Sequence, residues 1–523
     1  MPWVARGFAL LLAGCSSLVF AADCASLKTL GLADTHITVA ESVTTGSLEI
    51  ADAGTRLSGL PAFCRVAGEL RPTSDSQIRF EVWLPAQGWN GRLLGTGNGG
   101  FAGSIYYQQL AGYLRRGFAA SATDAGHQAE GTDASWAYGH SEKVKDFGWR
   151  AIHLTAETSK RILNAYYGKP ANKAYFDACS DGGREALMEA QRFPQDYDGI
   201  LAGAPANAWS TILAGGASLM QGLTGDPKAY IPDRKLGAIQ RASLAACDAL
   251  DGVKDNVVGD PAKCRFDPQV LLCKGDDARD CLTPPQIDSL KMIYSGFKDG
   301  QGRIVFPGFS MGDETSWKQW IVGEDPLNSL ASRFVQNYFR YMVVGDPKAN
   351  VLTASVDELL RESKANGAPD LDSTDPDLSR FRAHGGKLIL YHGWNDPAIS
   401  PENTIAYFDS LEREMGKQKV GTFVRLYMVP GMEHCSNGPG ASAFGQFGIE
   451  TSKGPKYGLF DSLENWVEKG SPEENVVATK YEAQPNAEMK ASFTRPLCAY
   501  PKIARYTGSG DTNQAANFAC VVP

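Results

Sequence analysis

One serine lies where a strand-like run changes abruptly into a helical one. Residues Ala174 to Ala178 form a short run typical of a buried strand, and Arg184 to Phe193 carries apolar residues at helical spacing. Between them, Ser180 stands in the sequence Ala-Cys-Ser-Asp-Gly, a nucleophile elbow without its usual first glycine. Such a turn exposes the hydroxyl above a helix N-terminus, which favours developing negative charge. The pattern indicates a nucleophilic serine; the alternative is a helix-capping serine after a buried strand.

A nucleophilic serine needs a base and an acid, and two later strand ends supply them. Asp396 follows one buried strand-like run, and His434 follows the next. The order Ser180, Asp396, His434 is the α/β-hydrolase order of nucleophile, acid and base. Each residue stands where a strand ends, which is where open α/β sheets place their sites. His392 is the main rival base, but its position inside the strand turn favours a structural hydrogen bond, and an Asp before Pro is also ordinary turn chemistry.

A glycine-rich loop at residues 95–103 follows an early strand-like run. It lacks the Lys-Ser/Thr of a P-loop, and its spacing does not match a dinucleotide fingerprint. We favour a loop whose backbone N–H groups point at a developing oxyanion, as in hydrolases where it follows an early strand. Simple turn chemistry is the alternative.

The elements around these residues predict an α/β fold: an α/β-hydrolase sheet with a large inserted lid domain. Alternating strands and helices favour a parallel sheet covered by helices. The run 78–84 alternates like a half-exposed strand. The other expected strands are 93–94, 118–123, 174–178, 199–204, 387–393 and 422–429, and the expected helices are 147–167, 184–193, 404–415 and 459–468.

The composition and the hydrophobic pattern of the chain change between residues 207 and 373. This segment is rich in Pro, Gly, Asp and aromatic residues and shows no clean alternation. We interpret 207–373 as a lid domain, and 22–206 together with 374–523 as the α/β-hydrolase catalytic domain.

Composition and the first residues bear on location. The net charge of −8 and the lack of a long basic run argue against a nucleic-acid partner. Residues 1–21 resemble a short export signal, and an alternative lipoprotein signal would end before Cys15. No later stretch is apolar enough to form a transmembrane segment. The expected location is periplasmic or extracellular, or the outer membrane for a lipoprotein; the oligomeric state stays open.

Eleven cysteines are present, and ten remain after Cys15, which lies in the signal. An even number in an exported chain predicts five disulfides, whereas zinc is disfavoured because no Cys-x-x-Cys or His-x-x-x-His cluster occurs. Spacing suggests local pairs and leaves Cys179 and Cys435, each beside a candidate catalytic residue, although spacing alone does not fix connectivity. The suggested local pairs are Cys24–Cys64, Cys247–Cys264, Cys273–Cys281 and Cys498–Cys520.

Over essentially its whole mature length, the chain resembles the tannase and feruloyl esterase family, which includes mono(2-hydroxyethyl) terephthalate hydrolase. The family is marked by a Cys-Ser at the elbow, an Asp and a His-Cys, with the two cysteines bonded. Cys179-Ser180, Asp396 and His434-Cys435 match this mark. The resemblance therefore implies a Cys179–Cys435 disulfide, which closes a loop of about 255 residues and constrains the unfolded chain by about 5 kcal/mol.

The resemblance also implies an oxyanion hole and a structural calcium site. The oxyanion donors would be the N–H groups of Asp181 and of either Gly99 or Gly100. The calcium loop would lie in the lid, where oxygen ligands alone suit a hard cation; a solvated acidic turn is the alternative. Its ligands would be the carboxylates of Asp248, Asp251 and Asp255 and the carbonyls of Val253 and Val257.

The activity implied by the resemblance is that of a secreted serine carboxylic-ester hydrolase acting on small-molecule esters of aromatic acids. Lid aromatic residues suit a flat acyl group, and Ile399 is expected to approach the same pocket. A terephthalate carboxylate would need a cation, for which Arg333 is the one candidate, so feruloyl (hydroxycinnamoyl) or galloyl esters are favoured over terephthalate monoesters. The candidate aromatic walls are Trp317, Trp320, Phe334, Tyr338 and Phe339.

Three alternatives remain. The first is an esterase like mono(2-hydroxyethyl) terephthalate hydrolase. The second is a non-catalytic aromatic or carbohydrate binder on the same fold, since folds do not dictate function. A serine peptidase is chemically possible but is disfavoured because the family hydrolyses esters.

Overall fold

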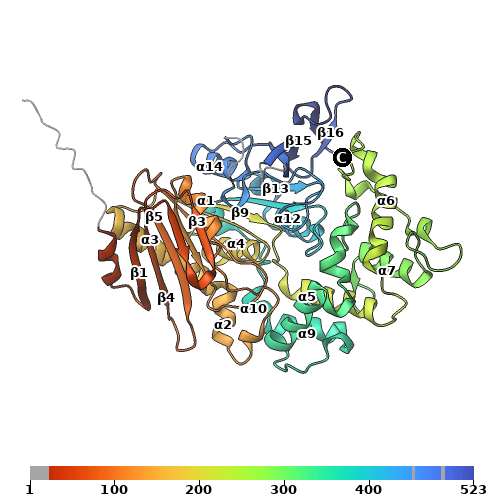
Figure 1. Ribbon diagram of the computed structural model, residues 1–523, viewed down its shortest axis with the longest axis horizontal. Helices are drawn as coiled ribbons and strands as arrows, with labels where there is room; N and C mark the ends of the chain where they lie inside the picture. Colours follow the sequence, from red (N-terminus) through yellow and green to blue (C-terminus); the bar gives the residue numbers. More distant parts are fainter. Residues whose placement is uncertain (1–22, 450–453, 484–488) are drawn as a thin grey trace, which may run out of the picture.

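A nine-stranded, mostly parallel sheet with helices on both faces forms the centre of the molecule (Figure 1). The computed structural model describes residues 23–449, 454–483 and 489–523, so the expected signal at 1–21 and Cys15 lie outside the described residues. The spatial order is β1-β4-β5-β7-β6-β8-β9-β12-β13, with parallel pairing from β7 to β13. The strands are β1 (Thr35–Val43), β4 (Phe63–Leu70), β5 (Ile78–Pro85), β6 (Arg92–Thr96), β7 (Ala119–Thr123), β8 (Lys173–Cys179), β9 (Gly199–Gly203), β12 (Lys387–Gly393) and β13 (Val424–Val429).

Two hydrophobic cores lie on opposite faces of this sheet, because successive side chains of a strand point to opposite sides. Phe176 and Ile200 pack in one core with residues of α3, α4 and α12. Tyr175 and Leu201 pack in the other with residues of α1 and α14. These helices are α1 (Tyr107–Arg115), α3 (Ala151–Tyr167), α4 (Asp181–Arg192), α12 (Pro401–Met415) and α14 (Leu459–Lys469).

Residues 78–84 form a strand as expected, but the expectation that this strand is half-exposed is wrong. β5 pairs with β4 on one side and β7 on the other, and its side chains other than Arg79 are buried. Glu81, which supplied part of the alternation, is 2% exposed and pairs with Arg65 at 2.6 Å. A charged residue can occupy a buried strand when a partner compensates its charge, so the alternation was misleading.

Sequence patterns did not predict the antiparallel additions at either end of the chain. β1 and β4 extend the sheet at its N-terminal edge, and three of the four described two-stranded sheets outside it lie near the chain ends. The hairpin strands are β2 (Ser47–Ile50), β3 (Thr55–Ser58), β14 (Asn475–Ala483), β15 (Met489–Cys498), β16 (Ile503–Tyr506) and β17 (Phe518–Val521).

Between β9 and β12 the chain leaves the sheet and forms a largely helical body, the green part of Figure 1. The ends of the expected lid lie together, because Ser373 N–H donates to the Asn207 carbonyl at 2.9 Å. The body contains α5 (Trp209–Thr224), α6 (Leu236–Cys247), α7 (Pro284–Ser295), β10 (Phe297–Lys298), β11 (Ile304–Phe306), α8 (Leu330–Asn337), α9 (Val356–Asn366) and α10 (Ala368–Leu371). The remaining α-helices of the described residues are α2 (Ser141–Lys145), α11 (Ser379–His384) and α13 (Lys417–Val420).

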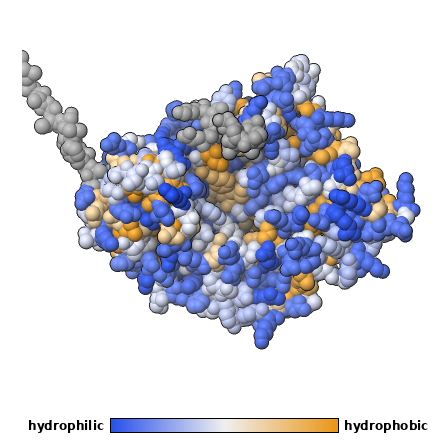
Figure 2. All heavy atoms as spheres, viewed as in Figure 1, coloured by the Kyte–Doolittle hydropathy of each residue, from blue (hydrophilic) through white to orange (hydrophobic). Residues whose placement is uncertain are grey.

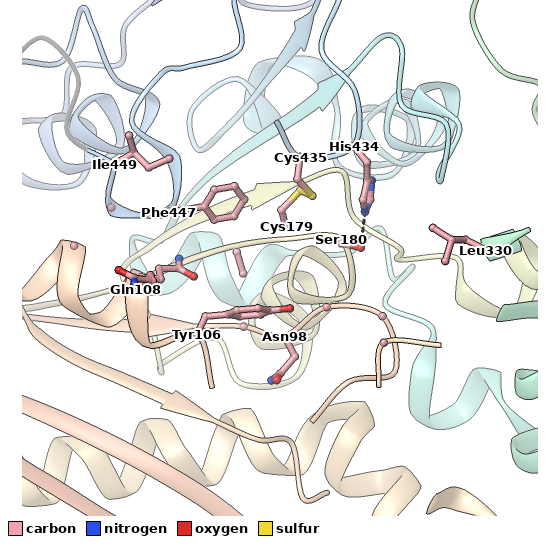
Figure 3. A pocket seen from close by; sticks show the side chains of 18 of the residues that line it. Asn98, Tyr106, Gln108, Cys179, Ser180, Leu330, His434, Cys435, Phe447 and Ile449 are labelled. Carbon is pink, nitrogen blue, oxygen red and sulfur yellow. Dashed lines mark hydrogen bonds between the residues drawn. A yellow bond between two sulfur atoms is a disulfide. The ribbon is translucent and has the colours of Figure 1, made fainter. Parts of the chain in front are cut away.

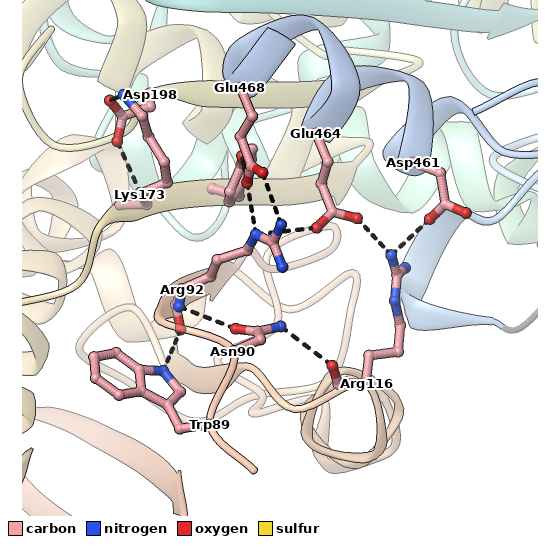
Figure 4. Close-up of polar contacts among 11 residues, drawn as sticks. Trp89, Asn90, Arg92, Arg116, Lys173, Asp198, Asp461, Glu464 and Glu468 are labelled. Atoms are coloured by element: carbon pink, nitrogen blue, oxygen red, sulfur yellow. Dashed lines mark hydrogen bonds and ion pairs between the residues drawn. The ribbon is translucent and has the colours of Figure 1, made fainter. Parts of the chain in front are cut away.

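Ion pairs attach helix α14 to the N-terminal half of the sheet (Figure 4). Arg92 contacts Glu468 at 2.6 Å and Glu464 at 3.4 Å. Arg116 contacts Glu464 at 2.8 Å and Asp461 at 2.6 Å. Segments more than 340 residues apart in sequence are thus held together by shared carboxylates.

The five disulfides expected from the sequence are confirmed. Four close local loops and one, Cys179–Cys435, spans 256 residues. In the described part of the chain, no helix has the length and apolarity needed to cross a bilayer. The face in Figure 2 is mostly hydrophilic, with hydrophobic residues gathered in a recess near its middle.

Candidate active site

Ser180 lies at a sharp turn between β8 and α4. Its backbone has φ 67° and ψ −122°, a conformation that residues other than glycine rarely adopt. Ala178 replaces the usual first glycine of the elbow, and the neighbouring chain makes room for its methyl group. A Cβ added at Gly182 or Gly97 would lie 2.6 or 2.8 Å from Ala178 Cβ. The missing glycine is therefore compensated by two others.

A chain of hydrogen-bonding contacts links Ser180 to His434 and Asp396, the residues expected from the sequence, and Figure 3 shows the contact between Ser180 and His434. Ser180 Oγ lies 2.8 Å from His434 Nε2, and His434 Nδ1 lies 2.7 Å from Asp396 Oδ2. The other carboxylate oxygen, Asp396 Oδ1, accepts the N–H groups of Ala398 and Ile399. This geometry is suited to moving the serine proton to His434 while the carboxylate orients the imidazole.

The environment of Asp396 keeps its carboxyl group ionised. Burial alone would raise its pKa, but the nearby His434, together with hydrogen bonds from His392 and His434, lowers the pKa below its ordinary value. His392 Nε2 lies 3.1 Å from Asp396 Oδ2, and its Nδ1 lies 2.6 Å from Thr404 Oγ1. His392, the alternative base considered from the sequence, therefore hydrogen-bonds the Asp396 carboxylate. The histidine that contacts Ser180, at 2.8 Å, is His434.

The Cys179–Cys435 disulfide lies beside Ser180 and His434. Its cysteines are the neighbours of Ser180 and His434, and their Cα atoms are 6.0 Å apart. The bond thus joins the end of β8 to the loop after β13, whose strands are not adjacent in the sheet. It fixes the separation of two loops that carry the serine and the histidine (Figure 3).

The expected oxyanion donors lie around the same serine. Gly99 and Gly100 line a cavity together with Ser180. The Asp181 side chain points into the protein, where it pairs with Arg184 at 2.6 Å and both side chains are fully buried, so this residue presents its backbone at the start of α4. Gly182 N–H donates to the Asn98 carbonyl at 2.8 Å and joins the glycine loop to the elbow.

Two cavities adjoin Ser180. The larger, of about 900 Å³, extends from Ser180 and His434 past the glycine loop to Tyr106, Gln108 and Ile449. The smaller, of about 90 Å³, is mostly apolar and lies toward the inserted body. Its lining includes Trp209, Ile212, Leu213, Phe297, Phe306, Phe309, Trp320, Phe334 and Ile399.

Three of the expected pocket residues reach these cavities. Trp320 and Phe334 line both, with parallel rings 6.2 Å apart, and Ile399 lines the smaller. The Trp320 ring also meets His434 edge-on at 5.3 Å.

The other expected pocket residues are placed elsewhere, and these expectations are corrected. Trp317 and Tyr338 are at most 2% exposed and pack in the core of the inserted body, as does Phe339. Arg333 is exposed on α8 and belongs to neither described cavity lining. Consecutive residues on a helix point about 100° apart, so Arg333 points away from the cavity that its neighbour Phe334 lines.

Several lining residues were missed by sequence reasoning. Tyr106 and Gln108 come from the start of α1, and Phe447 and Ile449 from a turn before α14 (Figure 3). These short segments carry no motif, and tertiary packing alone brings them to Ser180.

The expected calcium ligands lie in one loop of the inserted body, but they do not form a closed cluster. Asp248 accepts the N–H groups of residues 255–257, and Asp251 accepts that of Val253. Asp255 pairs with Arg495, and burial with the charge of Asp255 raises the pKa of Asp251 to about 6. The ligand oxygens of the three carboxylates do not all lie within 4.8 Å of one another. Among the described residues, one other cluster of His, Cys, Asp or Glu side chains has its ligand atoms this close together. Their oxygen chemistry, and the negative charge that the single Arg495 leaves unbalanced, fit a hard divalent cation.

The chain is similar to several known esterases. An uncharacterized esterase of Xanthomonas campestris is 40% identical, covering 96% of this chain and 91% of the relative. A probable feruloyl esterase B-2 of Aspergillus flavus is 34% identical, and the match covers 84% of this chain and 83% of the relative. The crystal structure of feruloyl esterase B from Aspergillus oryzae superposes with a TM-score of 0.88 at 29% identity, covering 96% of this chain and all of that one.

The sheet, the serine turn and these similarities define an α/β-hydrolase that is a carboxylic ester hydrolase. The model of the family described as tannase and feruloyl esterase matches residues 64–521, and the chain belongs to that family.

Proposed function

We propose that this enzyme hydrolyses esters of aromatic carboxylic acids, of the feruloyl or galloyl type, through a Ser180–His434–Asp396 triad and an acyl-enzyme. The observation that carries the proposal is the continuous contact from Ser180 Oγ through His434 to Asp396, at an elbow that opens on two cavities. A non-catalytic binder would need no such arrangement.

The proposed reaction has two halves. Ser180 Oγ attacks the ester carbonyl carbon while His434 Nε2 takes its proton, and the carbonyl oxygen becomes an oxyanion near the N–H of Asp181 and of Gly99 or Gly100. When the intermediate collapses, His434 gives the proton to the leaving alkoxide and the acyl group stays on Ser180. Water then attacks the acyl-enzyme with His434 as base, releasing the acid and restoring the serine.

The cavity linings support the choice of an aromatic, uncharged acyl group. Trp320 and Phe334 supply parallel aromatic surface beside His434, which suits stacking and burial of a flat ring. Arg115 is the one Lys or Arg in the described lining of the larger cavity, and its guanidinium already donates to the carbonyls of Ser58 and Gly59. The smaller cavity has none. A terephthalate monoester would therefore lack a free cationic partner.

A panel of esters tests the substrate class. We expect kcat/KM to be higher for methyl ferulate and methyl gallate than for the monoester of terephthalate or a short aliphatic ester. Trp320→Ala should reduce kcat/KM on the aromatic esters by about tenfold or more, since it removes stacking area, and should spare the aliphatic ester. Arg333→Ala, at an exposed position, is the matched control and should leave kcat/KM unchanged for every ester in the panel. Preference for the aliphatic ester would overturn the aromatic assignment, and preference for terephthalate would overturn the ranking.

We also propose that residues 207–373 act as a lid over the acid side of the site and bind Ca²⁺ in the loop of residues 248–257. Asp248, Asp251 and Asp255, with the carbonyls of Val253 and Val257, would hold the ion. Its role would be to neutralise these carboxylates and fix the loop.

The same proposal includes export directed by residues 1–21. Five disulfides support an oxidising compartment. Mass spectrometry of the mature N-terminus would distinguish a cleaved signal from a lipid on Cys15.

A further inference from the structure

A second cluster of ionisable side chains lies on helices α3 and α4, apart from the serine site. His153 on α3, Glu189 near the end of α4 and Asp196 in the following loop each offer one ligand atom, and these atoms all lie within 4.8 Å of one another. Among the described residues no other trio of His, Cys, Asp or Glu meets this spacing. His153 Nδ1 lies 2.6 Å from Asp196 Oδ2.

Glu189 is the unusual member of this cluster. Its side chain is 1% exposed, and neither carboxylate oxygen receives a hydrogen bond from a donor among the described residues. Burial and the facing carboxyl group of Asp196 raise the pKa of Glu189 well above its ordinary value. A buried carboxylate without a donor is costly, so the pair must hold either a proton or a cation between its oxygens.

The surroundings of the cluster supply a balancing charge and a further oxygen. Lys160 contacts Asp196 through the other oxygen, Oδ1, at 3.1 Å and so neutralises one charge of the pair. The face of the His153 ring stacks on Phe193 at 3.8 Å, which fixes the orientation of the imidazole. Glu157, one turn further along α3, lies 3.9 Å from His153 Nε2 and is half-exposed, so it can supply a further oxygen.

We propose that His153, Glu189 and Asp196 form a binding site for a divalent transition-metal ion, with Zn²⁺ as the best-fitting ion. One imidazole nitrogen with two carboxylate oxygens is a donor set that suits Zn²⁺ rather than Ca²⁺, which prefers oxygen alone. A fourth position is left for water or Glu157. The ion would join α3, the far end of the elbow helix α4 and the loop that leads to β9. It takes no part in the chemistry at Ser180.

Zinc titration of the purified full-length protein tests the site. The protein is first stripped of metal and then kept in excess CaCl₂, so that the proposed calcium loop is filled. Isothermal titration with ZnCl₂ is expected to show one saturable site that is lost, or weakened by at least about tenfold, in Glu189→Gln and His153→Gln. Glu189→Gln keeps the side-chain volume and leaves no ionisable group at this buried position, so it should fold.

His140→Gln is the matched control, because His140 also pairs with an aspartate, Asp75, at 2.8 Å but has no third buried carboxylate. It should bind Zn²⁺ like the wild type. An ion that binds elsewhere is retained in Glu189→Gln, so the difference between the two titrations isolates this site. Equal zinc stoichiometry and affinity in wild type and Glu189→Gln would overturn the proposal.

A second measurement does not depend on the variants. Co²⁺ bound by nitrogen and oxygen in a four-coordinate site gives visible absorption bands, which Zn²⁺ should remove when it displaces the ion. Because the metal must displace the proton held by the two carboxyl groups, binding should weaken as pH falls. A featureless Co²⁺ spectrum, or zinc affinity that does not change with pH, would contradict the assignment.

Discussion

At the scale of single residues, Ser180 combines a strained backbone with close packing. Its φ of 67° falls between β8 and α4, and the preceding residue, Cys179, is held by its disulfide to Cys435. Gly182 and Gly97 leave the space that Ala178 fills. Small residues are therefore required on both sides of the elbow, although Ala178 stands where the usual pattern has a glycine.

Ser180→Ala is expected to abolish ester hydrolysis, with a loss of several powers of ten in kcat, because the nucleophile is removed. His434→Ala should be comparably severe because no base remains 2.8 Å from the serine. Initial rates on methyl ferulate and a thermal melt measure activity and folding separately. Near-wild-type turnover by a purified, folded Ser180→Ala enzyme would refute the triad.

Glu185 supports the glycine loop from behind. Its Oε2 accepts the Asn98 N–H at 2.8 Å, and its Oε1 lies 3.3 Å from Asn98 Nδ2. The Asn98 carbonyl in turn accepts from Gly182. Burial, with the charge of Asp181, raises the pKa of Glu185 from 4.5 to about 8, against the opposing charge of Arg184. Glu185 is a positioning residue for the proposed oxyanion donors.

Glu185→Gln is expected to lower kcat by about tenfold or more with little change in KM, because donors that act only on the oxyanion are misaligned. The wild-type carboxyl binds its proton more tightly when folded, so its contribution to stability falls as pH rises from about 4.5 to about 8. The melting temperature of the variant should therefore rise relative to wild type over that range. A constant difference, or an unchanged kcat, would contradict this role.

At the scale of elements, the disulfide compensates for the topology of the sheet. β8 and β13 are separated by β9 and β12, so no backbone hydrogen bonds hold their ends together. The Cys179–Cys435 bond connects those ends directly beside Ser180 and His434.

Replacing Cys179 and Cys435 together by Ala should lower the melting temperature and the turnover number. The loop of 256 residues implies an entropic loss of about 5 kcal/mol in the chain-entropy model. The control is the Cys273–Cys281 pair, which closes 8 residues and lines neither cavity beside Ser180; its loss should cost about 2.5 kcal/mol and leave turnover unchanged. Equal effects on turnover would show that the first bond does not position the site. Free thiols at Cys179 and Cys435 in the denatured, unreduced protein would also contradict it.

At the scale of the whole molecule, the inserted body is attached to the C-terminal strands. Asp255 in the loop of residues 248–257 pairs with Arg495 on β15. A Cβ at Gly252 of the same loop would lie 3.3 Å from Tyr506 Cβ on β16. This loop therefore contacts two C-terminal strands that are distant from it in sequence.

Chelation of calcium is expected to lower the melting temperature more than it lowers kcat measured at low temperature. A ligand that binds only the folded state stabilises it, whereas the loop of residues 248–257 takes no part in the proposed chemistry. Melts in excess chelator and after CaCl₂ is restored provide the measurement. An identical melting curve in chelator and in calcium would argue against a bound ion.

Local patterns in the sequence determined much of the sheet and the order of the candidate triad. Buried strands such as 387–393 and the elbow around Ser180 are specified by residues close in sequence, and local steric and periodic rules apply to them directly. The resemblance to a family added the long disulfide, which spacing left open.

Only the tertiary structure decided which side chains form the cavities and which carboxylates are buried together. Trp317 and Trp320 are three residues apart, yet one lies in the core and the other meets His434. Glu81 is buried because Arg65 comes from a neighbouring strand. His153, Glu189 and Asp196 come together across two helices and a loop. Such contacts depend on how elements pack, and hydrophobic burial is non-directional, so no local pattern in the sequence specifies them.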